Sequence, residues 1–165
     1  MNEISLSEVL SRIDRLRCGE AVALFAPLAD ELADAHELGA AHRAINAHSI
    51  RLGDDGVSFV PSPRARKRPA GVRARAEDVG DLAGVIAGAL LGREVDPDGW
   101  ADRAVALGVP TDLVTVLATA LSGRAAQRPT AYELAAALRA ACDPVPLDRL
   151  LSPARTEGPS PVSGR

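Results

Sequence analysis

The sequence predicts a mainly α-helical domain with one short β-hairpin, and three observations lead to this fold class. First, 47% of the 165 residues are hydrophobic but only 2% are aromatic, so Ala and Leu, which favour helices, must build the core. Second, Ser5–Glu8 and Thr130–Glu133 have the spacing of capping boxes, which open helices. Third, Asp54-Asp55-Gly56 separates two short apolar runs, a pattern typical of a hairpin turn.

The first half of the chain is expected to form two helices and the hairpin. A short helix follows the first capping box, and a second begins at Gly19 and ends near Gly39, where glycine tolerates the left-handed conformation of a helix terminus. The second helix carries these residues at helical spacing: Val22, Phe25, Leu28, Ala29, Leu32 and His36. An irregular segment, residues 40–49, leads to the hairpin strands 50–52 and 57–60.

The second half is expected to contain a basic loop and four helices. Residues 61–76 combine prolines with a cluster of basic side chains, which predicts an exposed loop. The expected helices are 78–91, apolar on most sides and therefore central, then 100–107, 113–121 and 131–141. Residues 143–165 are rich in Pro, Ser and Gly and are predicted to be a flexible tail, so the folded domain is expected to span residues 1–142.

The composition disfavours several classes of protein. A net charge of −3 gives no general attraction to nucleic acid. The longest mostly apolar run, residues 79–91, is too short to span a bilayer, and no signal peptide is recognisable, so a soluble, cytoplasmic protein is expected. Cys18 and Cys142 have no metal-ligand spacing and are expected to be reduced thiols. The many Ala residues and the single lysine, Lys67, indicate a GC-rich bacterial genome.

Five short strings occur in an informative order. They are A-H-E-L-G at 35–39, H-R-A-I-N-A-H-S-I at 42–50, E-D-V-G-D-L-A-G-V at 77–85, L-L-G-R at 90–93, and A-L, Q-R-P-T and E-L between 120 and 134. The second string is similar to the catalytic-loop motif H-R-D-I-K-P-x-N-I of protein kinases. Together the strings resemble the C-terminal lobe (C-lobe) of a bacterial Ser/Thr protein kinase, beginning after the hinge, with the N-lobe absent.

The resemblance also implies that the catalytic groups are missing. Ala44 stands where a kinase has its catalytic Asp, Asn46 where it has a Lys, and Ser49 where it has a magnesium-binding Asn. Pro61-Ser62-Pro63 stands where the Asp of D-F-G should be, and no acidic residue between Asp55 and Glu77 replaces the Glu of A-P-E. The resemblance therefore implies a catalytically inactive pseudokinase with no nucleotide, metal or other cofactor.

Other matching positions are structural in the kinase family. The resemblance implies that His42 and Arg43 hold the loop, and that Asp78 accepts hydrogen bonds from the loop backbone. Arg128 matches an Arg that pairs with the A-P-E glutamate, so it is expected to pair with Glu77 or to face solvent. A metal site at His42 and His48, or a nucleophilic Ser49 beside His48, lacks a third group at a recognisable spacing and is disfavoured.

These observations favour a protein-interaction adaptor or regulatory subunit. The partner-binding candidates are Arg64, Arg66, Lys67, Arg68, Arg73 and Arg75. Arginines bind carboxylates and phosphates bidentately, which predicts an acidic or phosphorylated protein partner, whereas nucleic acid is disfavoured because no aromatic residues are interleaved. An uncovered apolar surface near residues 40–49 and the hairpin would indicate a homodimer or an N-lobe-like partner. Half of a split kinase and an unrelated helical bundle are the alternatives.

Overall fold

The computed structural model describes residues 3–63, 69–92, 95–96 and 98–152. Its elements are β1 (Ile4–Ser5), α1 (Leu6–Arg12), α2 (Cys18–Glu37), β2 (Ile50–Gly53), β3 (Gly56–Phe59), α3 (Val72–Leu91), α4 (Trp100–Ala106), α5 (Thr111–Leu121), the 3-10 turn η1 (Ala125–Gln127), α6 (Ala131–Ala141) and α7 (Asp148–Leu151). The mainly α-helical class with a small sheet is confirmed. No helix in these ranges is long and apolar enough to cross a membrane.

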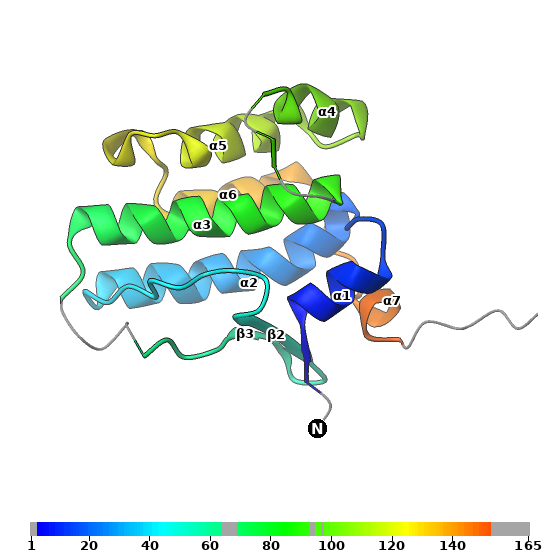
Figure 1. Ribbon diagram of the computed structural model, residues 1–165, viewed down its shortest axis with the longest axis horizontal. Coiled ribbons are helices and arrows are strands. Elements are labelled where there is room, and N and C mark those ends of the chain that lie inside the picture. Colours follow the sequence, from blue (N-terminus) through cyan, green and yellow to red (C-terminus); the bar gives the residue numbers. More distant parts are fainter. Residues whose placement is uncertain (1–2, 64–68, 93–94, 97, 153–165) are drawn as a thin grey trace, which may run out of the picture.

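Helix α3 is the centre of the molecule (Figure 1). α5 and α4 pack on one side of it, and α2, which also packs along α6, lies on the other. The helix is buried on several sides because Val79, Leu82, Ile86 and Leu90 are all within 1% of complete burial. This placement agrees with the apolar, central helix predicted from the sequence.

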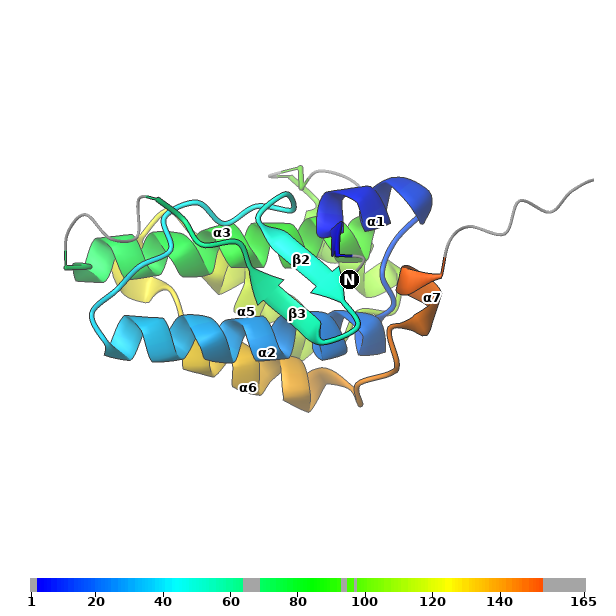
Figure 2. The same cartoon turned by 90° about the horizontal axis from the view of Figure 1, so that it is seen from below.

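The hairpin lies against α2 and carries a third strand that the sequence did not reveal (Figure 2). β2 and β3 are antiparallel with Gly53 opposite Gly56, and the positive φ of +117° falls on Gly56, as an Asp-Gly turn favours. β1 adds to the other edge of β2 through the pair Ile4 and Leu52. A strand of two residues has no sequence period, so only the long-range pairing defines it.

Helix α3 begins earlier than the sequence predicted, at Val72 and not near residue 78. The loop predicted for residues 61–76 therefore ends at Gly71, and Arg73 and Arg75 belong to the helix. Two contacts explain the earlier start. Ala70 N donates to the Gly39 carbonyl at 2.7 Å, and the Arg73 guanidinium pairs with Glu77 one turn later at 3.0 Å.

Four of the six partner-binding candidates, Arg64, Arg66, Lys67 and Arg68, lie outside the described residues. Arg73 and Arg75 are therefore the two candidates whose positions can be compared with the fold.

The domain also extends beyond residue 142, where the predicted tail began. Val145 N donates to the Gly19 carbonyl at 3.1 Å, and Leu150 is only 3% exposed. The Arg149 guanidinium donates to both carboxylate oxygens of Glu20 at 2.7 Å, and the Glu20 side chain is 3% exposed. Residues 143–152 thus belong to the fold because they satisfy a buried carboxylate and bury a leucine. The remaining predicted tail residues, 153–165, lie outside the described part of the chain.

Candidate functional site

The segment of residues 40–49, which we call the central loop, is attached to α3 through the buried carboxylate of Asp78. This side chain has no exposed surface. Its Oδ2 accepts from His42 N and its Oδ1 from Arg43 N, both at 2.7 Å. The Nε2 atom of His36 lies 3.0 Å from Oδ2. Such charge-assisted hydrogen bonds compensate the desolvation of a buried carboxylate and fix the irregular backbone.

The bonds from the central loop to Asp78 are those that the kinase resemblance implied, but the contribution of His36 was missed. In the sequence His36 occupies an apolar position of the second helix, and its spacing only predicts burial. Its contact with Asp78 joins residues 42 positions apart. A histidine placed among buried leucines is the one signal that a polar partner was required.

The backbone at Arg43 is strained. Arg43 is the one residue other than glycine with a positive φ in the described part of the chain, at +64°. An L-residue adopts this left-handed conformation only at a cost, so surrounding contacts must hold it. The two adjacent N–H groups of His42 and Arg43 both bind Asp78, which provides this constraint.

The ring of His42 connects the central loop to the chain that leaves the hairpin. Its Nε2 lies 2.9 Å from the Val60 carbonyl oxygen, and its ring centre is 4.9 Å from that of Phe59. His42 therefore holds the end of β3 against the loop, immediately before Pro61-Ser62-Pro63. The structural role that the resemblance implied for His42 has a physical basis in these two contacts.

The second half of the central loop forms hydrogen bonds with itself. The Asn46 side-chain oxygen accepts from His48 N at 2.9 Å and from Ser49 N at 3.1 Å. The Ser49 hydroxyl accepts from Asn46 N at 3.0 Å and donates to the Asn46 carbonyl at 2.9 Å. Asn46 and Ser49 thus form a closed local turn, in which short polar side chains replace backbone partners. Within the described residues, the hydrogen bonds of the Ser49 hydroxyl go to Asn46 and none goes to the His48 ring.

Arg128 adopts neither of the two arrangements that the sequence suggested. It does not pair with Glu77, which binds Arg73, and it does not point into solvent. Its Nε donates to the Ser122 carbonyl and its Nη1 to the Ala76 carbonyl, both at 2.9 Å. A Cβ atom on Gly80 would lie 2.6 Å from Nη1, so glycine makes room for the guanidinium. Arg128 therefore joins the end of α5 to α3 through backbone oxygens.

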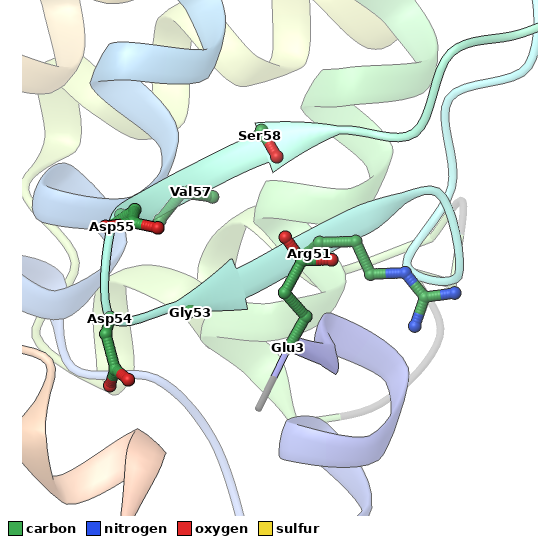
Figure 3. A pocket seen from close by; sticks show the side chains of 8 residues that line it. Glu3, Arg51, Gly53, Asp54, Asp55, Val57 and Ser58 are labelled. Atoms are coloured by element: carbon green, nitrogen blue, oxygen red, sulfur yellow. The ribbon is translucent and has the colours of Figure 1, made fainter. Parts of the chain in front are cut away.

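The outer face of the hairpin is polar. A shallow cavity of about 130 Å³ there is lined by Glu3, Arg51, Asp54, Asp55 and Ser58 among others (Figure 3). Of the large apolar residues near the hairpin, Val60 is 36% exposed. A larger and mostly apolar hollow of about 630 Å³ lies on another side of the central loop, where Ile45 and Ala47 line it together with Val85. A homodimer or an N-lobe-like partner therefore stays a prediction.

Metal binding finds no geometric support in the described residues. Within residues 3–63, 69–92, 95–96 and 98–152, no group of three or more His, Cys, Asp or Glu side chains is placed to hold a metal ion. His42 uses Nε2 for the Val60 carbonyl, and His48 is exposed. The central loop therefore offers a bonded scaffold, and none of its described contacts forms a metal centre.

The fold matches that of solved protein kinases. No family model matches the sequence, and no curated protein matches it. The crystal structure of the Mycobacterium tuberculosis PknI kinase domain superposes with a TM-score of 0.66 and 19% identity over 86% of this chain. A double mutant of the same domain gives a TM-score of 0.65 and 20% identity over 85% of this chain. The chain covers 64% and 62% of those two kinase domains.

The protein therefore has a kinase-like fold, as the sequence resemblance predicted. The helical order, the hairpin between α2 and α3 and the bond from Asp78 to the central loop agree with the resemblance to a C-lobe. The match to the PknI kinase domain shows a kinase-like arrangement of these helices, so the alternative of a helical bundle with a different fold is wrong. At this level of sequence identity the match establishes the fold alone.

Proposed function

We propose that this domain is a catalytically inactive pseudokinase that acts as a protein-interaction adaptor or regulatory subunit. The observation that carries the proposal is the closed turn of Asn46 and Ser49 next to Ala44. Phosphoryl transfer requires a group that accepts the proton of the acceptor hydroxyl and ligands that hold magnesium. The methyl group of Ala44 cannot accept a proton, and the side chains of Asn46 and Ser49 are engaged with neighbouring backbone atoms.

The electrostatics of nucleotide binding support the same proposal. A triphosphate brings several negative charges, which kinases neutralise with a lysine and magnesium. Lys67 is the one lysine of the sequence and belongs to the basic segment far from the central loop in sequence. Without metal ligands the desolvation of the triphosphate would be uncompensated. We therefore expect no nucleotide or other cofactor to bind.

The interaction role is supported by what the fold retains. Asp78, His36 and His42 hold the central loop in a defined conformation although the groups needed for catalysis are absent from it. A basic segment, residues 61–76, follows the hairpin and contains the six candidates for binding an acidic or phosphorylated partner. Arginine binds such groups through two parallel hydrogen bonds.

A second candidate function is a kinase C-lobe that is completed by an N-lobe elsewhere. It is favoured by one observation, namely that the chain covers 64% of the PknI kinase domain. An added N-lobe would supply a phosphate-binding lysine. It would not replace the carboxylates missing at Ala44 and at residues 61–63, so the inactive adaptor remains the preferred function.

A nucleotide assay tests the absence of catalysis. The purified protein is incubated with magnesium and radiolabelled ATP, with a general protein substrate, and its melting temperature is measured with and without the nucleotide. We expect no transfer and no change in melting temperature. The double variant Ala44→Asp and Ser49→Asn should also be inactive, because the remaining ligands are still missing. Phosphate transfer that occurs with the wild-type protein and is lost in Asn46→Ala, purified in the same way, would overturn the proposal.

A copurification experiment tests the interaction role. Wild type and a variant with Arg64, Arg66, Arg68 and Arg73 changed to Glu are recovered from the native host, and their bound proteins are quantified. We expect the charge reversal to remove the partner. A matched variant makes the same change of net charge at four exposed positions outside the basic segment, namely Arg12, Arg17, Arg103 and Arg124. Equal recovery by all three proteins would remove the basic segment from the proposed function.

A further inference from the structure

One end of the helical bundle contains a groove that none of the described contacts fills. It lies where α2 ends and where α3 and α6 begin, at the left of Figure 1, and has a volume of about 560 Å³. Ala33, Ala76, Val79, Pro129 and Ala131 line its floor and walls. We call it the end groove. It is separate from the central loop and from the polar face of the hairpin.

The end groove is bordered by the most exposed large apolar side chains of the described residues. Leu38 is 88% exposed, Tyr132 72% and Val72 69%. Val72 and Tyr132 line the groove, and Leu38 directly follows Glu37, which also lines it. Each of these side chains comes from a different helix terminus. Apolar residues gathered around a concave surface are typical of a protein-binding site.

Two guanidinium groups in the groove have no carboxylate partner. Arg75 makes one long contact, from Nη1 to the His36 carbonyl at 3.4 Å, and Arg128 binds two carbonyl oxygens. Neither arginine is within salt-bridge distance of a carboxylate in the described part of the chain.

The carboxylates around the groove do not neutralise these arginines. Glu37 is the one acidic residue of the lining. Glu77 pairs with Arg73, and the Glu133 carboxylate accepts hydrogen bonds from Thr130 at the start of α6. Asp81, outside the lining, is close enough to Arg128 for this charge to act on the pKa of Asp81, although burial raises that pKa. Within the lining there are two guanidinium groups and one carboxylate, so the groove carries a net positive charge that is complementary to an acidic ligand.

We propose that the end groove binds an acidic, amphipathic peptide segment of a partner protein. Its carboxylates would pair with Arg75 and Arg128, and an apolar side chain would lie between Val72 and Tyr132. The inference rests on the proposed adaptor function and names the chemistry of its partner. A carboxylate that pairs with a half-buried guanidinium gains more than one in open solvent, and an aromatic or aliphatic anchor supplies buried area.

A second copy of this chain fits the groove less well. A two-fold contact would place the same surface of both copies together, so that Arg75 and Arg128 would face their equivalents. Like charges at an interface disfavour association. The peptide of a different, acidic protein is therefore the occupant to which the proposal commits.

A peptide-display selection tests the proposal. A library of random 12-residue peptides is selected on the immobilised protein, and a fluorescein-labelled consensus peptide is titrated by fluorescence anisotropy. We expect enrichment of peptides that combine Asp or Glu with Leu, Phe or Tyr. Arg75→Glu should weaken binding at least tenfold by reversing a charge, and Ala126→Trp should do so by filling the groove, which Ala126 lines.

Two matched variants separate the groove from general effects. Arg103→Glu and Ala136→Trp make the same changes at exposed positions outside the lining and should alter the affinity less than twofold. No enrichment, enrichment of peptides without acidic residues, or binding that is equal in Arg75→Glu and Ala126→Trp would overturn the proposal. Concentration-dependent dimerisation in sedimentation velocity that Ala126→Trp abolishes would make the second copy the occupant and would also overturn it.

The same variants distinguish this proposal from the adaptor function. If a partner is still recovered from the host by Arg75→Glu and Ala126→Trp, the adaptor role stands and the end groove is not its binding site. If the nucleotide assay reveals phosphate transfer while the acidic peptides bind as expected, the groove proposal stands and the inactive pseudokinase is wrong.

Discussion

The two halves of the central loop are held in different ways. Residues 40–43 are fastened to the rest of the fold, since His42 N and Arg43 N bind Asp78 and the His42 ring binds the Val60 carbonyl. The side-chain hydrogen bonds of Asn46 and Ser49 stay within the loop, where each side chain binds the backbone of the other residue. The first half is therefore held by a buried side chain of α3. The second half is joined to the fold through its backbone, since Ser7 N donates to the Ala47 carbonyl at 3.0 Å and Val60 N to the Ser49 carbonyl at 2.7 Å.

The proposal of an inactive pseudokinase depends on this difference, because it requires a kinase-like fold that persists without kinase chemistry. The side chains that hold the first half, Asp78 and His36, lie on α3 and α2. The positions that the resemblance assigns to catalysis lie in the second half, which contacts the fold through backbone carbonyls that do not depend on the identity of the side chains. The bonds to Asp78 are present although Ala44, Asn46 and Ser49 occupy the positions that the resemblance assigns to catalysis. On the proposed function, the loss of catalysis and the retained stability would thus depend on separate residues.

The largest expected effect is the loss of Asp78. Asp78→Ala leaves two backbone N–H groups and His36 without their acceptor in a site that has no exposed surface. We expect unfolding to become easier by about 4 kcal/mol, the range for breaking a buried charged network. Urea unfolding followed by the fluorescence of Trp100, the single tryptophan, measures it.

If Asp78→Ala does not fold, Asp78→Asn keeps the shape and one acceptor and should lose a smaller part of the same free energy. A loss below about 1 kcal/mol in Asp78→Ala would mean that the first half of the loop does not depend on this carboxylate.

Glu20 is a second buried carboxylate. Removing its partner tests how much such an interaction contributes to the free energy of unfolding in another part of the fold. Burial alone would raise the pKa of Glu20, but hydrogen bonds from Arg149 and from the Arg17 backbone hold the pKa below its ordinary value of 4.5. Arg149→Ala should cost about 2 kcal/mol at pH 7, less than a fully buried pair because Arg149 is 41% exposed.

The pH dependence follows from the sign of that pKa change. A lowered carboxyl pKa stabilises the folded protein above pH 4.5, and this contribution is lost as the pH falls through the folded-state pKa. The stability difference between wild type and Arg149→Ala should therefore be largest near neutral pH and shrink at acidic pH. A difference that grows on acidification would contradict the ion pair.

Small effects are expected in the second half of the central loop. Asn46→Ala removes two bonds to exposed backbone groups, where water can replace them, so we expect a loss of about 1 kcal/mol or less. Ser49→Ala should cost no more. Both are measured as for Asp78→Ala, and a cost equal to that of Asp78→Ala would remove the distinction between the two halves.

Variants of the central loop should have their smallest effect on the reactivity of Cys18, which lies at the start of α2. Burial and the neighbouring Cys142 raise the pKa of the Cys18 thiol to about 12. Because the thiolate is the reactive form, Cys18 should be alkylated by iodoacetamide at pH 8 at least about 100-fold more slowly than a free cysteine. Mass spectrometry of digested protein measures the rate, and Asn46→Ala should leave it unchanged.

The sequence predicted the elements whose signals are local. Both capping boxes are present, with the Ser5 and Thr130 side chains accepting from the backbone N–H three residues later. The sequence also predicted the Asp-Gly hairpin and the left-handed Gly39, at φ +76°, because each depends on a few adjacent residues.

The features that the sequence missed depend on distant residues or on backbone atoms. The start of α3 has no side-chain cap, so Gly71 gave no signal and the arginines of its first turns suggested a loop. The final helix is held by Arg149 and Glu20, which are 129 residues apart. Arg128 binds two carbonyl oxygens, and a carbonyl has no sequence signature. The sequence located the central loop because its motif is contiguous. It did not reveal the contact of His36 with Asp78, because these residues are 42 positions apart.

The attachment of α7 to the start of α2 places the two described chain ends away from the end groove. Figure 1 shows α7 at the right and the N-terminal strand at the lower centre, while the groove lies at the left. Neither β1 nor α7 therefore borders the end groove. The bundle thus has two distinct ends, of which one carries α7 and the other the groove to which we assign peptide binding.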